Sequence, residues 1–306
     1  MKIAYAFRKG TFYPHEVKGF AEPVPKGPAR TRYLRKVNEI GFDGIELGVD
    51  MLDGMGVENG DVTELRKELD DAGTPCVAIR AGGALYQPKT AARNRDRLER
   101  AVKAAKALGA EVVNSAISAQ LRNPTQGTAG TGGRFHDGSS QLASEEDYVR
   151  TAKVLHEIGE VAGAEGLDIS IEVHQHSIAD NSWSTLHLLE LADSPYVYAN
   201  PDLGNILWNY DEPEETPEEA IVALAPHSKY WHCKNLHRVH VEEVERAYFI
   251  RVPLPDGDID YRFAISAMQD ASFGGYLAIE GANLGDQLYQ DQRSFDYVKS
   301  ILDEPR

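Results

Sequence analysis

Four polar residues stand where consecutive strand-like segments end in the second half of the chain. The segments DISIEVH, NPDLGN, KYWHCKN and YLAIEG deliver Glu172, Asp202, His232 and Glu280, respectively. Three carboxylates and one imidazole that meet without a cation repel one another in a low-dielectric interior. A divalent cation removes that conflict, and oxygen-rich ligation with one histidine suits Mn²⁺, Mg²⁺ or Co²⁺ better than a structural zinc ion. We therefore predict a metal site with these four ligands and with Mn²⁺ as the first choice.

Each of these four residues has an ordinary explanation when it is taken alone. A single carboxylate or histidine near a strand end is often a salt-bridge partner or a loop cap. The prediction depends on their combination at the ends of four successive strands. Strand parity supports it, because it places Glu172 on the same face as Ser170, while Ile171 and Val173 face the other way.

The elements that must position these residues are short apolar runs that alternate with longer amphipathic runs. This alternation predicts parallel strands joined by crossover helices. Eight such units favour a closed (β/α)8 TIM barrel of the α/β class over an open sheet, and no glycine-rich dinucleotide fingerprint follows the first strand. The predicted strands are Ile3 to Phe7, Gly44 to Leu47, Pro75 to Ile79, Glu111 to Ala116, Asp168 to Val173, Tyr196 to Asn200, Ser228 to Cys233 and Tyr276 to Glu280.

Helix ends and long connections complete the layout. A helix is predicted over Ala91 to Leu108, closed by Gly109, and another begins at Ser144 with an acidic first turn. Two connections are long, at residues 117–143 and 235–257, and in a barrel both lie on the catalytic face. The first is rich in Gly, Thr and Ser, and we expect either a flexible lid or an arm that contacts another subunit.

The bulk composition limits the class of protein. The 306 residues are 42% hydrophobic, which matches one barrel domain over residues 1–306. A formal net charge of -16 repels phosphate backbones, so we expect no nucleic-acid partner. No segment approaches the roughly 18 to 20 apolar residues that span a bilayer. Cys76 and Cys233 do not make a disulfide framework. We expect a cytoplasmic protein without a membrane partner.

Several segments, in this order and spacing, resemble the xylose isomerase-like TIM barrel superfamily of sugar isomerases, epimerases and related enzymes, which also includes endonuclease IV. The likeness runs over most of the chain. The segments that carry it are GFDGIELG (41–48), IEVH (171–174), NPDLGN (200–205), WHCKN (231–235), PDGDIDY (255–261) and GGYLAIEG (274–281).

The resemblance implies that Glu172, Asp202, His232 and Glu280 bind the metal, and that the two glutamates act as an acid-base pair. This role has a physical basis, because a metal that chelates the carbonyl and hydroxyl oxygens of a ketose acidifies the C–H between them and stabilises the enediolate. Similar epimerases place a substrate-binding arginine six residues after the histidine, and here that residue is Arg238. A surface arginine in a charged loop is the competing explanation.

The sequence departs from the family at several positions. Similar enzymes often have Asp-x-x-His after the sixth strand, whereas Asn205 follows Asp202 here. Asparagine can hydrogen-bond a substrate hydroxyl but cannot carry a proton as histidine does. Endonuclease IV needs extra histidines for a zinc cluster, and here the third and fourth strands end with Arg80 and with Asn114 or Ser115. DNA repair is therefore a poor match.

Other residues on predicted catalytic-face loops are candidates for contact with substrate. His174 is two residues beyond Glu172 and is our choice for an additional base, while His136 reaches the site only if its loop folds inward. We expect the remaining loop histidines to be solvated or structural. Trp208 is one of four aromatic residues that could stack on a bulky substrate, although aromatic residues in a barrel more often pack in the core. The others in this set are Trp183, Tyr210 and Trp231.

We predict a divalent-metal-dependent sugar isomerase or epimerase that moves a proton next to a carbonyl through a metal-bound enediolate. The alternative is a metal-dependent lyase on 3-oxo sugars, because the same chemistry expels a β leaving group. It would be either a C-glycoside deglycosidase-like enzyme with a small partner subunit or a dehydratase. A non-catalytic sugar-binding protein ranks third, since all four ligands are present. We expect an unphosphorylated sugar or glycoside substrate and a homo-oligomer.

Overall fold

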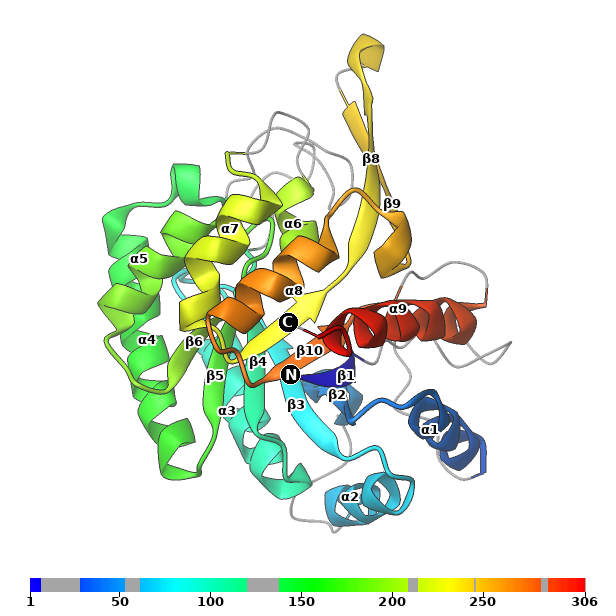
Figure 1. Ribbon diagram of the computed structural model, residues 1–306. Coiled ribbons are helices and arrows are strands. Elements are labelled where there is room, and N and C mark those ends of the chain that lie inside the picture. The colour runs from blue at the N-terminus through cyan, green and yellow to red at the C-terminus, as the bar shows by residue number, and fades with distance from the viewer. Residues whose placement is uncertain are drawn as a thin grey trace.

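Parallel strands and helices alternate along the chain, and the strands gather at the centre of the molecule (Figure 1). The computed structural model describes residues 1–6, 28–52, 61–119, 138–208, 214–244, 246–281 and 286–305. The barrel strands are β1 (Lys2–Ala6), β2 (Gly44–Gly48), β3 (Cys76–Gly82), β4 (Val112–Ala116), β5 (Asp168–Glu172), β6 (Val197–Asn200), β7 (Tyr230–Cys233) and β10 (Tyr276–Ile279).

These eight strands form one parallel sheet that is nearly closed. Their order is β6-β5-β4-β3-β2-β1-β10-β7, and an isolated bridge between Ala199 and Ser228 joins the two edges. The predicted (β/α)8 barrel is therefore confirmed. All eight predicted strands are present with small differences at their ends, the largest in β3, which extends to Gly82 instead of ending at Ile79. Phe7, the predicted end of the first strand, lies outside the described residues.

Helices surround the barrel and connect its strands (Figure 1). They are α1 (Pro28–Ile40), α2 (Asp61–Asp71), α3 (Ala91–Leu108), α4 (Glu145–Ala164), α5 (Ser182–Ala192), α6 (Leu203–Leu207), α7 (Pro217–Leu224), α8 (Tyr261–Asp270) and α9 (Gln287–Leu302). The predicted ends of two helices are confirmed. Gly109 closes α3 with a φ of 76°, in the left-handed region, and Ser144 caps α4 through a capping box with Asp147.

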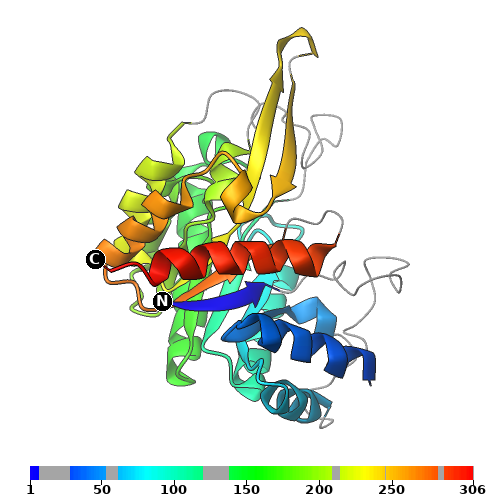
Figure 2. The same cartoon turned by 45° about the vertical axis from the view of Figure 1, so that its right-hand side comes forward.

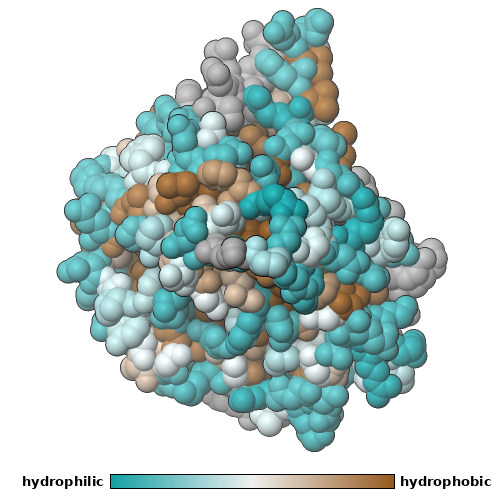
Figure 3. Space-filling view, viewed as in Figure 1, coloured by the Kyte–Doolittle hydropathy of each residue, from teal (hydrophilic) through white to brown (hydrophobic). Residues whose placement is uncertain are grey.

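The connection after β7 contains a β-hairpin that the sequence analysis did not assign. Strands β8 (Asn235–Val241) and β9 (Arg246–Val252) pair in antiparallel fashion and project from the barrel (Figures 1 and 2). Exposure alternates along β9, where Tyr248 and Ile250 are exposed and Ala247, Phe249 and Arg251 are more buried, as in a strand with one covered face. Hydrophobic side chains are visible along the hairpin (Figure 3), and Val239 and Ile250 are 45% and 46% exposed.

The barrel positions the site by bringing the carboxyl ends of its parallel strands to one mouth. The strands read as continuous apolar runs because helices cover the sheet, and β2, β7 and β10 are buried along their whole length. Both cysteines are buried and form no disulfide. Within the described part of the chain, every helix is too short or too polar to cross a bilayer.

Candidate metal centre

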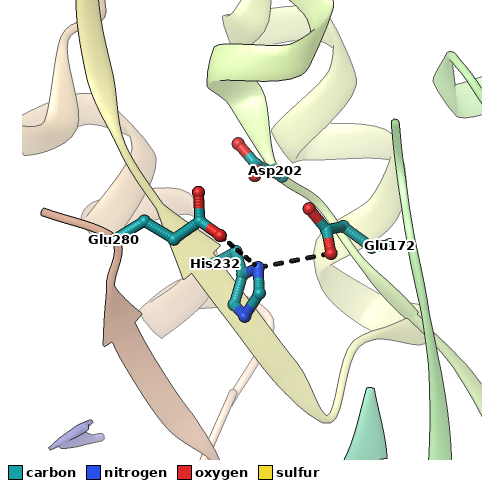
Figure 4. A group of neighbouring side chains, drawn as sticks. All are labelled: Glu172, Asp202, His232 and Glu280. Carbon is teal, nitrogen blue, oxygen red and sulfur yellow. Dashed lines mark ion pairs between the residues drawn. The ribbon is translucent and has the colours of Figure 1, made fainter. Parts of the chain in front are cut away.

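The four predicted ligands meet at the mouth of the barrel (Figure 4). Glu172 ends β5, Asp202 caps the N-terminus of α6, His232 lies in β7, and Glu280 follows β10. One ligand atom from each residue lies within 4.8 Å of the others, and all four residues are buried. A buried cluster of three carboxylates and one imidazole could bind a divalent metal ion.

Glu46 fixes the orientation of the His232 ring. The Glu46 Oε2 atom lies 2.6 Å from His232 Nε2, and Glu46 Oε1 accepts a 2.6 Å hydrogen bond from Arg80 Nη1. Because the carboxylate accepts the Nε2–H, Nδ1 is turned toward carboxylate oxygens of Glu172 and Glu280 at 3.4 and 3.3 Å. Nδ1 is buried and has no hydrogen-bond partner among the described residues. Carboxylate–histidine pairs of this kind orient histidine ligands at metal sites.

The charges of the cluster shift its ionisation. Burial favours the neutral imidazole, but Glu46 and Glu172 outweigh it and raise the pKa of His232 to about 9. Burial also opposes ionisation of Glu172, yet His232 holds the pKa of this carboxyl well below its usual range. A protonated histidine therefore balances the carboxylates in the metal-free protein, and a divalent cation would take over that role.

Two buried amides hold the Glu172 carboxylate. Asn114 Nδ2 donates to Glu172 Oε2 and Asn205 Nδ2 donates to Glu172 Oε1, both at 3.2 Å. Asn205 Nδ2 also donates to the Val173 carbonyl at 2.8 Å. Only the Oδ1 atom of Asn205 then remains for a substrate hydroxyl, and it is buried without a hydrogen-bond partner in the described chain.

Lys234 adds a positive charge that the sequence analysis did not assign to the site. Its Nζ donates to Asp202 Oδ2 at 2.5 Å and to Glu280 Oε2 at 3.2 Å, and the residue is 2% exposed. Gly204 leaves room for it, because a Cβ at that position would lie 2.5 Å from Lys234 Cγ. Lys234 belongs to the WHCKN segment, but its contact with Asp202 arises from the packing of α6, which residue spacing does not reveal.

Arg251 on β9 is a second residue that the sequence analysis missed. Its Nη1 lies 3.7 Å from Glu280 Oε2, and its guanidinium lies 5.4 Å from the centroid of the Trp208 ring. Trp208, a predicted substrate contact at the end of α6, also lies 5.5 Å from the Phe249 ring, centroid to centroid. The hairpin and the end of α6 therefore form one wall beside the cluster.

His174, the predicted additional base, lies near enough to Glu172 for that carboxylate to affect its ionisation. Its Nδ1 is 2.7 Å from the Gln175 carbonyl oxygen and 2.9 Å from Ser118 Oγ. Burial lowers the pKa of His174, although the charge of Glu172 acts in the opposite direction. The proximity fits an additional base, and that role stays a prediction.

The other predicted contacts have different outcomes. Arg238 lies on β8, half-buried, and its backbone N–H donates to Asp258 Oδ2 at 2.8 Å, so its contact with substrate stays a prediction. His136 and Tyr210 lie outside the described residues, together with most of the loop predicted as a lid or arm.

Two tryptophans of the predicted aromatic set have clear positions. Trp231 is fully buried and donates from Nε1 to the Pro201 carbonyl at 3.0 Å, so it is a core residue, as is more common for aromatic residues in a barrel, and offers no stacking surface. Trp183 is 52% exposed on α5.

Comparison with protein families agrees with the barrel. Residues 34–299 match the family described as xylose isomerase-like TIM barrel. The chain belongs to this family. The match extends from α1 into α9 and includes all four residues of the cluster.

Three relatives indicate the range of the family. Inosose dehydratase from Clostridium perfringens is 26% identical over 189 residues, and the match covers 57% of this chain and 58% of the dehydratase, little more than half of its length. A xylose isomerase-like TIM barrel protein from Mycobacterium smegmatis, solved in complex with magnesium, has a TM-score of 0.75 and 22% identity over 91% of this chain and 90% of its own. The structure of an L-ribulose 3-epimerase has a TM-score of 0.70 and 17% identity over 99% and 95%. These two structures have the same fold as this chain.

Proposed function

We propose that this protein is a divalent-metal-dependent sugar isomerase or epimerase that moves a proton at a carbon next to a carbonyl. The observation that carries the proposal is the placement of Glu172 and Glu280 on either side of His232, with Asp202 completing the buried cluster (Figure 4). Two carboxylates that flank a substrate can remove a proton on one side and return it on the other.

Glu172, Asp202, His232 and Glu280 would hold the metal ion. The donor set fits, because the Nδ1 atom of His232 faces carboxylates and has no hydrogen-bond partner in the described chain. Mn²⁺ is our first choice, with Mg²⁺ or Co²⁺ as the other candidates. A divalent ion here supplies the positive charge that acidifies a C–H beside a carbonyl.

The residues of the chain carry out the proton transfer. One of the two glutamates takes the proton from the C–H, and the electron pair moves toward the neighbouring carbonyl. Return of a proton by the other glutamate to the opposite face of the same carbon gives an epimer, whereas its return to the neighbouring carbon gives an isomer. The proposed substrate contacts are Asn205 Oδ1, Arg238 and Trp208, and His174 is the proposed additional base.

Elimination is the second candidate, because a relative that is 26% identical over 189 residues is an inosose dehydratase. After the same proton removal, the electron pair would break the C–O bond at the β carbon, and the departing oxygen would take up a proton and leave as water or an alcohol. Lys234, whose Nζ lies 3.2 Å from Glu280 Oε2, is the proposed donor of that proton. A C-glycoside deglycosidase-like activity belongs to this second candidate. The predicted homo-oligomer, small partner subunit and cytoplasmic location stay predictions.

Solvent-deuterium incorporation tests the proposal. Mn²⁺-loaded protein is incubated in D₂O with ketoses, 3-oxo sugars and 3-oxo glycosides, and the products are followed by NMR. We expect deuterium at the carbon next to the carbonyl and a rearranged sugar as product. Release of water or of an aglycone would favour the lyase instead. No exchange with any of these compounds, despite bound metal, would contradict both candidates.

A further inference from the structure

A buried arginine on the hairpin has hydrogen-bonding capacity that the metal centre does not use. Arg251 Nη1 is buried and has no hydrogen-bond partner among the described residues. It forms a long ion pair with Glu280 Oε2 at 3.7 Å, and its side chain is 18% exposed. A buried donor left unsatisfied costs about 1–3 kcal/mol. The guanidinium can therefore donate a hydrogen bond to an acceptor that the described part of the chain does not supply.

The register of the hairpin explains why Arg251 faces the site. Arg251 pairs with Leu236 across the two strands, and directly paired residues share one face of the hairpin. Leu236 is fully buried, whereas Tyr248 and Ile250 in β9 are 53% and 46% exposed. The alternation of β9 thus turns Arg251 inward while its neighbour Ile250 faces outward. The hairpin itself projects from the barrel (Figure 2), and Arg251 near the end of β9 lies with its Nη1 atom 3.7 Å from Glu280 Oε2.

Trp208 supplies a second unsatisfied donor beside this arginine. The Arg251 guanidinium lies 5.4 Å from the centroid of the Trp208 ring, and Trp208 Nε1 is buried with no hydrogen-bond partner in the described chain. The Phe249 ring lies 5.5 Å from the Trp208 ring. Two unsatisfied N–H donors among aromatic rings make an oxygen acceptor strongly favourable there, because few water molecules compete.

The charges around the centre indicate that this acceptor is an anion. Among the described residues that form it, four carboxylates stand against three permanently cationic side chains. A bound divalent ion beside a neutral His232 would leave one positive charge in excess. A carboxylate on the ligand would neutralise that charge and match the fork of a guanidinium, which a hydroxyl group does not. The carboxylates are Glu46, Glu172, Asp202 and Glu280, and the cations are Arg80, Lys234 and Arg251.

We propose that the substrate is a polyhydroxy compound that carries a carboxylate, and that Arg251 and Trp208 bind this carboxylate. The inference builds on the proposed function, since it names the substrate class for the same site. The hairpin would thus select acidic sugars over neutral sugars.

Equilibrium binding tests this assignment without any turnover. Mg²⁺-loaded protein is titrated in a calorimeter with D-gluconate, a polyhydroxy carboxylate, and with D-glucitol, its uncharged counterpart. We expect gluconate to bind at least about tenfold more tightly. Arg251→Met should bring gluconate to the affinity of glucitol, and Arg251→Lys should keep part of the difference. Trp208→Phe, which keeps the ring and loses the N–H, should weaken gluconate alone. Arg35→Met, at an exposed position on α1, is the control.

Three results would overturn the assignment. The first is equal affinity of the protein for gluconate and glucitol. The second is an Arg251→Met variant that still prefers gluconate. The third is an Arg251→Met variant whose kcat on neutral sugars falls while its gluconate affinity is unchanged. The last would mean that Arg251 serves an oxyanion formed in the reaction. If Arg251→Met does not fold, Arg251→Lys and Trp208→Phe carry the same comparison. Deuterium exchange without a gluconate preference would refute only this inference, whereas the preference without exchange would refute only the proposed function.

Discussion

At the scale of single residues, the 2.6 Å contact between Glu46 and His232 predicts how tightly the centre binds metal. Glu46→Gln keeps the shape of the side chain but removes the charge that orients the imidazole. We expect the affinity for Mn²⁺, measured by calorimetry, to fall about 10- to 100-fold. Glu64→Gln, at an exposed position on α2, is the matched control and should leave the affinity unchanged. Equal affinities in the two variants would show that Glu46 does not orient the ligand.

The protonation of His232 predicts a pH dependence of metal binding. Its pKa is raised to about 9, so near neutral pH the metal-free protein holds a proton that the metal must displace. The apparent affinity should therefore increase about tenfold for each pH unit up to pH 9 and level off above it. Calorimetric titrations from pH 6.5 to 9.5 measure this slope. An affinity that does not change over this range would mean that the imidazole is already neutral.

The two glutamates predict a loss of catalysis with little loss of structure. Glu172→Gln and Glu280→Gln remove the groups proposed to take and return the proton, so turnover should fall by at least about 10²-fold in each variant. Circular dichroism should show an unchanged fold. Glu64→Gln again serves as the control. Full turnover in either variant would refute the acid-base assignment.

The residues that sequence analysis identified differ from those it missed in one physical respect. Glu172 and Glu280 could be predicted because parallel strands in a barrel converge at one mouth, so residues at their ends must approach each other. Glu46 and Lys234 contact the same cluster through the directions of their side chains and the packing of α6, which residue spacing does not encode. Arg251 reaches the cluster because β9, the second strand of the hairpin, returns the chain to the barrel close to Glu280.

At the scale of elements, α6 approaches β7 so closely that only glycine fits at position 204. A Cβ there would lie 2.5 Å from Lys234 Cγ and 3.1 Å from the Lys234 carbonyl oxygen. Gly204→Ala should therefore lower the free energy of unfolding by about 1–3 kcal/mol and weaken Mn²⁺ binding, because Lys234 and Asp202 must move. Gly274→Ala is the control, since its Cβ would meet no atom within 4 Å.

Chemical denaturation and Mn²⁺ calorimetry measure the effects of these two glycine substitutions. If the Gly204→Ala protein is as stable as the Gly274→Ala protein and binds Mn²⁺ normally, α6 can shift to accommodate the Cβ without a loss of stability.

The helices and barrel strands were predictable from local signals, and the hairpin was not. Ala91–Leu108 carries an apolar stripe and a terminal glycine, and Ser144 begins a helix with an acidic first turn, so both ends match the structure. The segment 235–252 does not alternate regularly between apolar and polar residues, and its histidines, arginines and glutamates have the composition of an exposed loop. Pairing between β8 and β9 satisfies the backbone hydrogen bonds of this charged segment, and the sequence of one strand does not reveal its partner.

At the scale of the whole molecule, the hydrophobic pattern determines the barrel, while the reaction depends on details within it. The proteins that this chain resembles include an L-ribulose 3-epimerase of similar fold and an inosose dehydratase, so the fold alone does not distinguish proton return from elimination. Beyond the fold, the features of this chain that bear on function are the buried cluster with its supporting residues and the hairpin beside it. These features carry the proposals on function and substrate.

The metal centre is tested most directly by a titration with Mn²⁺ monitored by electron paramagnetic resonance. We expect one bound ion per chain in the natural protein, with magnetic coupling to a histidine nitrogen, and loss of that ion in Asp202→Asn. Glu64→Gln should bind the ion as the natural protein does. Absence of bound Mn²⁺, or an ion that persists unchanged in Asp202→Asn, would contradict the assignment of Glu172, Asp202, His232 and Glu280 as a metal centre.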